Sequence, residues 1–140
     1  MSNGKYLAID FGDKRVGLAI TDTTKQIAFP RDFLLVSSVD ELVRQINELC
    51  EREKVTKIII GLPIELEGAE GERAHKTRMF AKKLATAVEA DIDFFDERLT
   101  TRHANQLLRM QGVKSRDQKN QRDMISAQII LESYLRSVRN

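Results

Sequence analysis

Residues 5–21 read KYLAIDFGDKRVGLAIT. In the first half of this stretch, the apolar side chains of Leu7 and Ile9 alternate with smaller or polar ones, including Asp10. This two-residue period is typical of a β-strand with one face in a hydrophobic core. The next four residues form a tight polar stretch, and the alternation then resumes from Val16 to Thr21. The stretch therefore predicts a β-hairpin, with Asp10 on the face opposite Leu7 and Ile9.

The rest of the chain alternates between strand and helix signals. An apolar run broken by Pro30 predicts an edge strand, because proline cannot donate a hydrogen bond to a central ladder. Further along the chain we predict a helix from Ser38 to about Arg52, a buried strand over 57–61, a helix over 74–88, a strand over 92–95, a helix from Thr100 or Thr101 to Gly112, a basic connector over 113–122 and a helix over 123–138. This order predicts an α/β fold whose mixed five-stranded sheet has three antiparallel strands, then two parallel ones, flanked by helices.

Length and composition restrict the class of protein. The 140 residues, 41% hydrophobic and 31% charged, suit a single globular domain spanning 1–140. One cysteine, Cys50, can form neither an internal disulfide nor a cysteine-based zinc site. No signal-peptide core and no long apolar span occurs, so we expect a cytoplasmic protein without membrane contact.

Positive charge is concentrated in the last third of the chain. The whole chain has 23 basic and 21 acidic residues, but residues 98–140 contain nine basic and three acidic ones. Such an excess suits a phosphate backbone as ligand, and it also suits solvated surface helices. Charge alone leaves both interpretations open.

Three carboxylates occur where the fold alone does not require them: Asp10 within a strand, Glu97 after a strand and Asp123 on the last helix. Each of these carboxylates could instead have a purely structural role. Asp10 could bond turn amides, Glu97 could pair with a nearby arginine, and Asp123 could interact with the dipole in a first helical turn. Against the last alternative, Asp123 shares a helical face with apolar residues four, seven and eleven positions later.

If Asp10, Glu97 and Asp123 converge, their charges repel one another unless cations neutralise them. Oxygen-only ligands select Mg²⁺ or Mn²⁺. Two such ions ~3.5–4 Å apart would activate water and stabilise the leaving oxygen in phosphodiester hydrolysis. The three acids therefore predict a metal-dependent catalytic site.

Four sequence blocks resemble the YqgF family of bacteria, a family of pre-16S rRNA nucleases and Holliday junction resolvase-like proteins. These blocks are residues 10–17 (DFGDKRVG), 61–63 (GLP), 96–101 (DERLTT) and 123–131 (DMISAQIIL). The resemblance implies the ribonuclease H-like fold, with Asp10, Glu97 and Asp123 at the acidic metal-binding positions. It also implies that Arg15 and Arg98 lie near the phosphate or orient an acid. The remaining motif positions would shape the backbone, and these are Gly12, Gly17, Gly61 and Pro63.

The function that the resemblance implies is maturation of the 5′ end of pre-16S rRNA in ribosome biogenesis, on a ribosome precursor. Two alternatives stay open: a junction-specific DNA resolvase, which needs a dimer, and a non-catalytic RNA-binding assembly factor. A monomer and a homodimer are both compatible with the sequence. The expected contacts to nucleic acid, besides Arg15 and Arg98, are Lys114, Arg116, Lys119 and Arg122.

Overall fold

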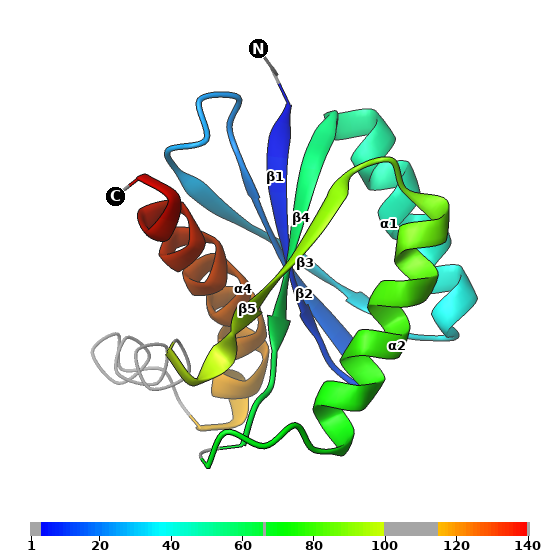
Figure 1. Ribbon diagram of the computed structural model, residues 1–140, viewed down its shortest axis with the longest axis vertical. Helices are drawn as coiled ribbons and strands as arrows, with labels where there is room; N and C mark the ends of the chain where they lie inside the picture. The colour runs from blue at the N-terminus through cyan, green and yellow to red at the C-terminus, as the bar shows by residue number, and fades with distance from the viewer. Residues whose placement is uncertain (1–3, 66, 100–114, 140) are drawn as a thin grey trace.

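The computed structural model describes residues 4–65, 67–99 and 115–139, with the backbone alone described at residues 99, 115–125 and 139. In this part of the chain, five strands form one sheet with helices on both faces (Figure 1). The elements are β1 (Lys5–Phe11), β2 (Arg15–Thr21), β3 (Ala28–Leu35), α1 (Val39–Glu53), β4 (Val55–Leu62), α2 (Glu72–Ala87), β5 (Asp91–Asp96), a 3-10 helix (Glu97–Leu99) and α4 (Ser115–Arg139). The helix expected between Thr100 and Gly112 lies outside the described residues.

The strand order in the sheet is β3-β2-β1-β4-β5. β1 pairs antiparallel with β2, β2 pairs antiparallel with β3, and β4 runs parallel to both β1 and β5. The predicted mixed sheet is therefore confirmed, as is the edge position of the strand that contains Pro30. Because β1, β4 and β5 run in the same direction, their carboxyl ends meet at one edge of the sheet.

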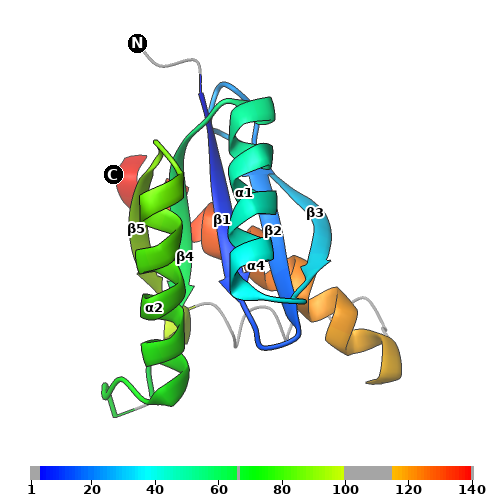
Figure 2. The same cartoon turned by 90° about the vertical axis from the view of Figure 1, so that its right-hand side faces the viewer.

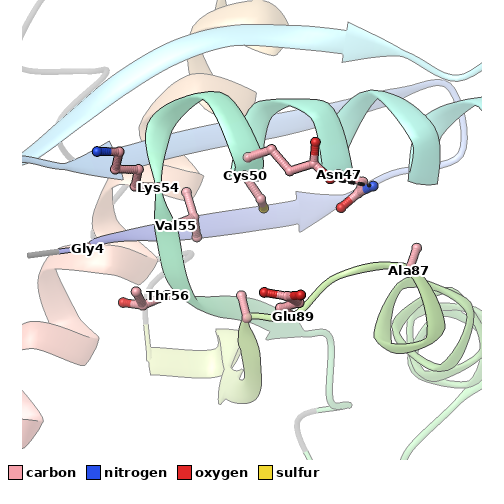
Figure 3. A pocket seen from close by; sticks show the side chains of 10 residues that line it. Gly4, Asn47, Cys50, Lys54, Val55, Thr56, Ala87 and Glu89 are labelled. Carbon is pink, nitrogen blue, oxygen red and sulfur yellow. Dashed lines mark hydrogen bonds between the residues drawn. The ribbon is translucent and has the colours of Figure 1, made fainter. Parts of the chain in front are cut away.

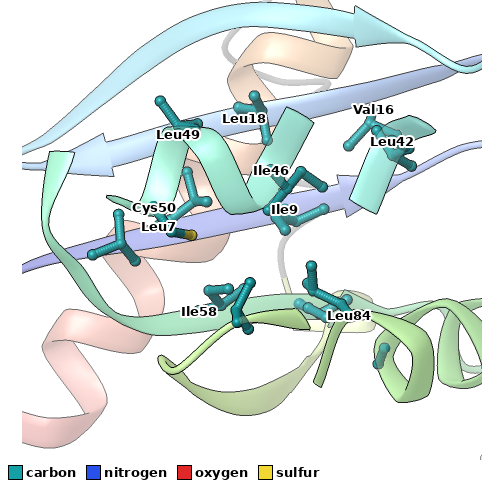
Figure 4. Close-up of a cluster of buried hydrophobic side chains, with 14 of the residues drawn as sticks. Leu7, Ile9, Val16, Leu18, Leu42, Ile46, Leu49, Cys50, Ile58 and Leu84 are labelled. Atoms are coloured by element: carbon teal, nitrogen blue, oxygen red, sulfur yellow. The ribbon is translucent and has the colours of Figure 1, made fainter. Parts of the chain in front are cut away.

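The two faces of the sheet bury different sets of side chains. Helices α1 and α2 cover one face, where the large residues of β1, β2 and β4 form the main core (Figure 4). Leu7, Ile9 and Ile58 are completely buried in this core. Helix α4 covers the opposite face over small side chains such as Ala8 and Ala19 (Figures 1 and 2). These alanines let α4 approach the centre of the sheet closely.

The second half of α4 is fixed to the sheet by a buried tyrosine. Tyr134 is only 8% exposed, and its hydroxyl group donates a hydrogen bond to Asp93 Oδ2 at 2.7 Å. The same hydroxyl oxygen accepts a hydrogen bond from Lys57 Nζ at 3.1 Å. The Tyr134 ring also packs edge-on against Tyr6, with 6.3 Å between ring centroids. Tyr134 thus joins α4 to β1, β4 and β5.

The start of α4 differs from the sequence prediction. We expected a connector over 113–122 and a helix from residue 123, but α4 already begins at Ser115. Residues 115–122 lack an apolar stripe, which made them resemble a loop, yet lysine, arginine and glutamine are good helix formers. A helical segment that extends beyond the sheet needs no apolar face toward it. Figure 2 shows these first turns of α4 extending past β3, beyond the sheet.

In the part of the chain that the structure describes, no helix is both long and apolar enough to cross a membrane.

We expect Tyr134→Phe to lower the free energy of unfolding by about 0.5–1.5 kcal/mol, because the substitution removes the hydroxyl group that the partly exposed Lys57 and Asp93 side chains share. Urea unfolding measures this loss. Ser137→Ala is the matched control, since it removes an exposed hydroxyl from the same helix and should change stability by less than about 0.5 kcal/mol. Equal stability of Tyr134→Phe and the wild type would contradict the role given to this hydroxyl.

The same hydroxyl gives the fold a dependence on alkaline pH. Burial raises the pKa of Tyr134 above 10.0, and the hydrogen bond to Tyr134 raises the pKa of Lys57 above 10.5. Groups with raised pKa values contribute stability that is complete below their unfolded pKa and is lost as pH rises through the folded pKa. The stability contributed by Tyr134 and Lys57 is therefore lost above about pH 10.

Candidate active site at the carboxyl ends of the strands

Asp10 lies near the carboxyl end of the central strand, on the face that α4 covers. It follows the buried Ala8 by two residues, so both project from the same face of β1. Its partner on β2 is Gly17. On the other side, Ala8 pairs with Ile59 and Ile9 with Ile60, and one further step of this register brings Asp10 level with Gly61. The half-buried Asp10 is thus flanked by a glycine on each neighbouring strand.

Glu97 reaches the same edge from the 3-10 helix that follows the outer strand β5. A Cβ atom added to Gly61 would meet Cγ of Glu97 at 2.8 Å, Cδ of Glu97 at 2.9 Å and Cδ1 of Ile130 at 2.6 Å. The Glu97 side chain therefore extends back over β4, into space that only a glycine leaves open. Its carboxyl group lies roughly one strand spacing, ~5 Å, from the row occupied by Asp10. The structure brings these two predicted site residues to the same edge and face of the sheet.

A compact ion pair shapes the turn that carries Glu97. Asp96 Oδ1 accepts a hydrogen bond from the backbone N–H of Arg98 at 2.9 Å, and Asp96 Oδ2 accepts one from Nη2 of Arg98 at 2.6 Å. These hydrogen bonds hold the pKa of Asp96 below its ordinary value of 3.8. The sequence left two roles open for Arg98, which are binding a phosphate and orienting an acid. The contact with Asp96 supports the second role. Asp96 itself is a residue that sequence reasoning missed, although its place beside Glu97 was a signal.

The third predicted acid, Asp123, belongs to α4. It lies eight residues after Ser115, so it is inside the helix, and the alternative of an acid in the first helical turn is wrong. Ile130, which contacts the Gly61 position, follows Asp123 by seven residues, or about two turns. The predicted apolar face is confirmed, because Ala127, Ile130 and Tyr134 are buried. The side chain of Asp123 is outside the described part of the chain, so its approach to Asp10 stays a prediction.

The donors at this edge suit a hard divalent cation. Asp10 and Glu97 supply carboxylate oxygens, and a cation placed between them would offset the repulsion between their charges. Among the described residues there is no group of three or more His, Cys, Asp or Glu that could hold a metal ion. The side chain of Asp123 lies outside this part of the chain. The donor chemistry of Asp10 and Glu97 therefore fits the expected Mg²⁺ or Mn²⁺. The full set of three ligands stays a prediction.

The motif glycines have separate structural roles. A Cβ atom on Gly12 would lie 2.5 Å from the carbonyl oxygen of Arg15, so the β1–β2 turn requires glycine there. Gly17 faces Asp10, and Gly61 lies beneath Glu97. Pro63 follows the last residue of β4 and ends the strand, as predicted.

The predicted nucleic-acid contacts fall in two places. Arg15 begins β2, where its guanidinium group lies 5.3 Å from the centroid of the Phe33 ring. Arg116, Lys119 and Arg122 belong to the first turns of α4, so they are helical and not part of a loop as expected. Lys114 lies outside the described residues.

A separate cavity of about 650 Å³ lies at the opposite end of the sheet (Figure 3). Its lining includes Val55 at the start of β4, Cys50 near the end of α1 and Glu89 before β5. Asp10 and Glu97 lie at the carboxyl ends of their strands, so this cavity is not part of the candidate site. Burial raises the pKa of the Cys50 thiol to about 11, and Cys50 stays a protonated core residue at neutral pH.

A mixed sheet in this order, with helices on both faces and carboxylates at its carboxyl edge, defines the ribonuclease H-like class of folds. Two solved structures share it over nearly the whole chain. "T. thermophilus RuvC in complex with Holliday junction substrate" has a TM-score of 0.61 at 13% identity, covering 98% of this chain and 96% of that one. "Crystal structure of Fowlpox virus resolvase and substrate Holliday junction DNA complex" has a TM-score of 0.52 at 12% identity, covering 97% and 99%. At these identities the likeness shows the fold alone.

Sequence similarity goes further and shows the family. The chain matches the family described as "RuvX: Holliday junction resolvase" over residues 4–137, and it belongs to this family, which is also called YqgF. A relative from Rickettsia peacockii, named "Putative pre-16S rRNA nuclease", is 37% identical over 138 residues, covering 99% of this chain and 90% of the relative. A relative from Chloroflexus aurantiacus with the same name is 36% identical over 135 residues, covering 96% and 88%.

We expect Gly61→Ala to lower the free energy of unfolding by about 1–3 kcal/mol, because its Cβ would displace both Glu97 and Ile130. Chemical denaturation measures the loss. Gly71→Ala is the comparison: Gly71 is the N-cap of α2, and a Cβ there would approach, at 2.9 Å, only the flexible end of Glu65, so we expect a smaller loss of less than about 1 kcal/mol, mainly from the cap. An equal loss of unfolding free energy in the two variants would contradict a contribution of the close packing at Gly61 to stability.

Proposed function

We propose that residues 1–140 form one nuclease domain that hydrolyses phosphodiester bonds with divalent metal ions and processes the 5′ end of pre-16S rRNA. The observation that carries this proposal is the position of Glu97 over Gly61, the residue level with Asp10 on the neighbouring strand, on the face of the sheet that α4 covers. Asp10 on β1 and Glu97, directly after β5, place two carboxylates at one edge of the sheet, at an electrostatic cost that a cation offsets.

In this proposal, Asp10, Glu97 and Asp123 hold Mg²⁺ or Mn²⁺, with two ions when substrate is bound. Ions bound there would activate the attacking water and stabilise negative charge on the leaving oxygen. The chain's own contribution is to hold the acids rigidly. Asp10 is fixed within a central strand, while Asp96 and Arg98 fix the turn that presents Glu97. Tyr134 fixes the helix that contains Asp123.

The substrate backbone requires positive charge beside the acids. Arg15 projects from the same face of the sheet as Asp10, and we propose that it binds a phosphate there. Arg116, Lys119 and Arg122 lie in the α4 segment that extends past the sheet, and Lys114 directly precedes this helix in the sequence. They would extend this path along the nucleic acid and bind its backbone without reading its sequence.

RNA as substrate is supported by the names of the relatives from Rickettsia and Chloroflexus. A Holliday junction resolvase is the second candidate, supported by the family's description and by the resolvase folds. The two candidates use the same acids and differ in substrate and in the need for a dimer. We place the protein in the cytoplasm, acting on a ribosome precursor.

We expect Asp10→Asn, Glu97→Gln and Asp123→Asn each to reduce Mg²⁺-dependent cleavage of a 5′-extended 16S precursor RNA by at least about 100-fold, because each removes a charged metal ligand. Gel mapping of products with Mg²⁺, Mn²⁺ or EDTA measures this. Asp40→Asn is the control, since Asp40 lies on α1, across the sheet, with 87% of its side chain exposed. Wild-type rates in all three variants would refute the proposed site.

A four-way DNA junction assayed in parallel separates the candidate substrates. Metal-dependent cleavage of the junction alone would support the resolvase. RNA binding by the wild type without cleavage of either substrate would instead indicate an assembly factor.

A further inference from the structure

The strand β3 contains an irregularity directly beside the candidate site. Val16 pairs with Leu34 and Leu18 pairs with Arg31, so β3 has one more residue than β2 over this interval. The two residues that face Gly17 are therefore Asp32 and Phe33. A bulge of this kind re-aims side chains locally and increases the twist of the strand.

The bulge brings Phe33 to the face on which Asp10 lies. Leu34 packs against the core under α1 and α2, and its neighbour Phe33 projects from the opposite face. Asp10, on β1, pairs with Gly17 on β2. Asp10, Gly17 and Phe33 consequently follow one another across three strands on one face, and the middle residue has no side chain.

Arg15 lies on this face as well, because its neighbour Val16 projects into the opposite core. Its guanidinium carbon is 5.3 Å from the centroid of the Phe33 ring, and both residues are half-buried. Contact with an aromatic face attracts the cation and restricts the rotamers of a long side chain.

We infer that Phe33 is a positioning residue for substrate binding: it restricts the Arg15 guanidinium group to the face of the sheet on which Asp10 lies, where Arg15 binds a phosphate of the nucleic-acid strand. This inference rests on the proposed function. It gives a role in substrate binding to Phe33, an aromatic residue of the edge strand that lies outside the four sequence motifs. The ring acts through Arg15, and an aliphatic side chain of similar size cannot replace it.

The test is a binding titration of the full chain carrying Asp10→Asn, with Mg²⁺ and a short fluorescein-labelled RNA that spans the 5′ end of the 16S precursor. We expect Phe33→Leu to weaken binding about three- to tenfold and Phe33→Tyr to keep it within about twofold. Phe29→Leu is the matched control. Phe29 is a 47% exposed aromatic residue of the same strand, and it pairs with Ile20, whose side chain belongs to the core on the opposite face.

A double-mutant cycle separates positioning from a purely structural role. In an Arg15→Ala background, Phe33→Leu should have no further effect on RNA binding, because the group that Phe33 positions is gone. Arg15→Ala should reduce the salt dependence of binding by about one phosphate contact, whereas Phe33→Leu should leave it unchanged.

Undiminished binding by Phe33→Leu, or the same loss in both backgrounds, would overturn the inference. If Asp10→Asn nevertheless abolished cleavage, the proposed function would stand without it. Absence of binding to both this RNA and a four-way DNA junction would overturn the proposed function, and the inference with it.

Discussion

The close packing at Gly61 is the constraint on which the candidate site depends. The position where another residue would have its Cβ lies within 3 Å of atoms from both Glu97 and Ile130. One missing side chain therefore lets the β5 turn fold back over β4 and lets α4 approach the same point. Asp10 lies one strand away, on the same face. The geometry of the acids follows from this contact and from the small residues that line the α4 side of the sheet.

One face of the sheet holds the main hydrophobic core, and the other face holds the candidate active site. The face under α1 and α2 buries large aliphatic and aromatic side chains, including the stacked rings of Phe11 and Phe80 at 4.5 Å between centroids. The strand residues on the α4 face are mostly small, such as Ala8, Ala19 and Gly61, and polar groups lie at the two ends of this face. The Tyr134 network lies toward the amino ends of β1, β4 and β5, and the carboxylates lie at their carboxyl ends. A helix fixed at one end in this way can hold a residue near its other end at a defined place.

Much of this arrangement follows from local sequence patterns. The alternation in residues 5–21 indicated the hairpin, the run Ile58–Ile60 indicated the buried parallel strand, and the placement of Asp10 and Glu97 after apolar stretches singled them out. The features that sequence reasoning missed depend on contacts between distant segments. The start of α4 at Ser115 has no apolar periodicity to reveal it, the ion pair of Asp96 needs the turn geometry, and the position of Phe33 is set by a bulge that only pairing with β2 defines.

The central claim is that Asp10, Glu97 and Asp123 converge on divalent metal ions. A crystal structure of the full chain soaked in Mn²⁺, with anomalous diffraction data, tests this claim most directly. The account predicts anomalous peaks between the three carboxylates, on the α4 face of the sheet and beside Gly61. Peaks elsewhere on the molecule, or carboxylates directed away from one another with no peak between them, would contradict it.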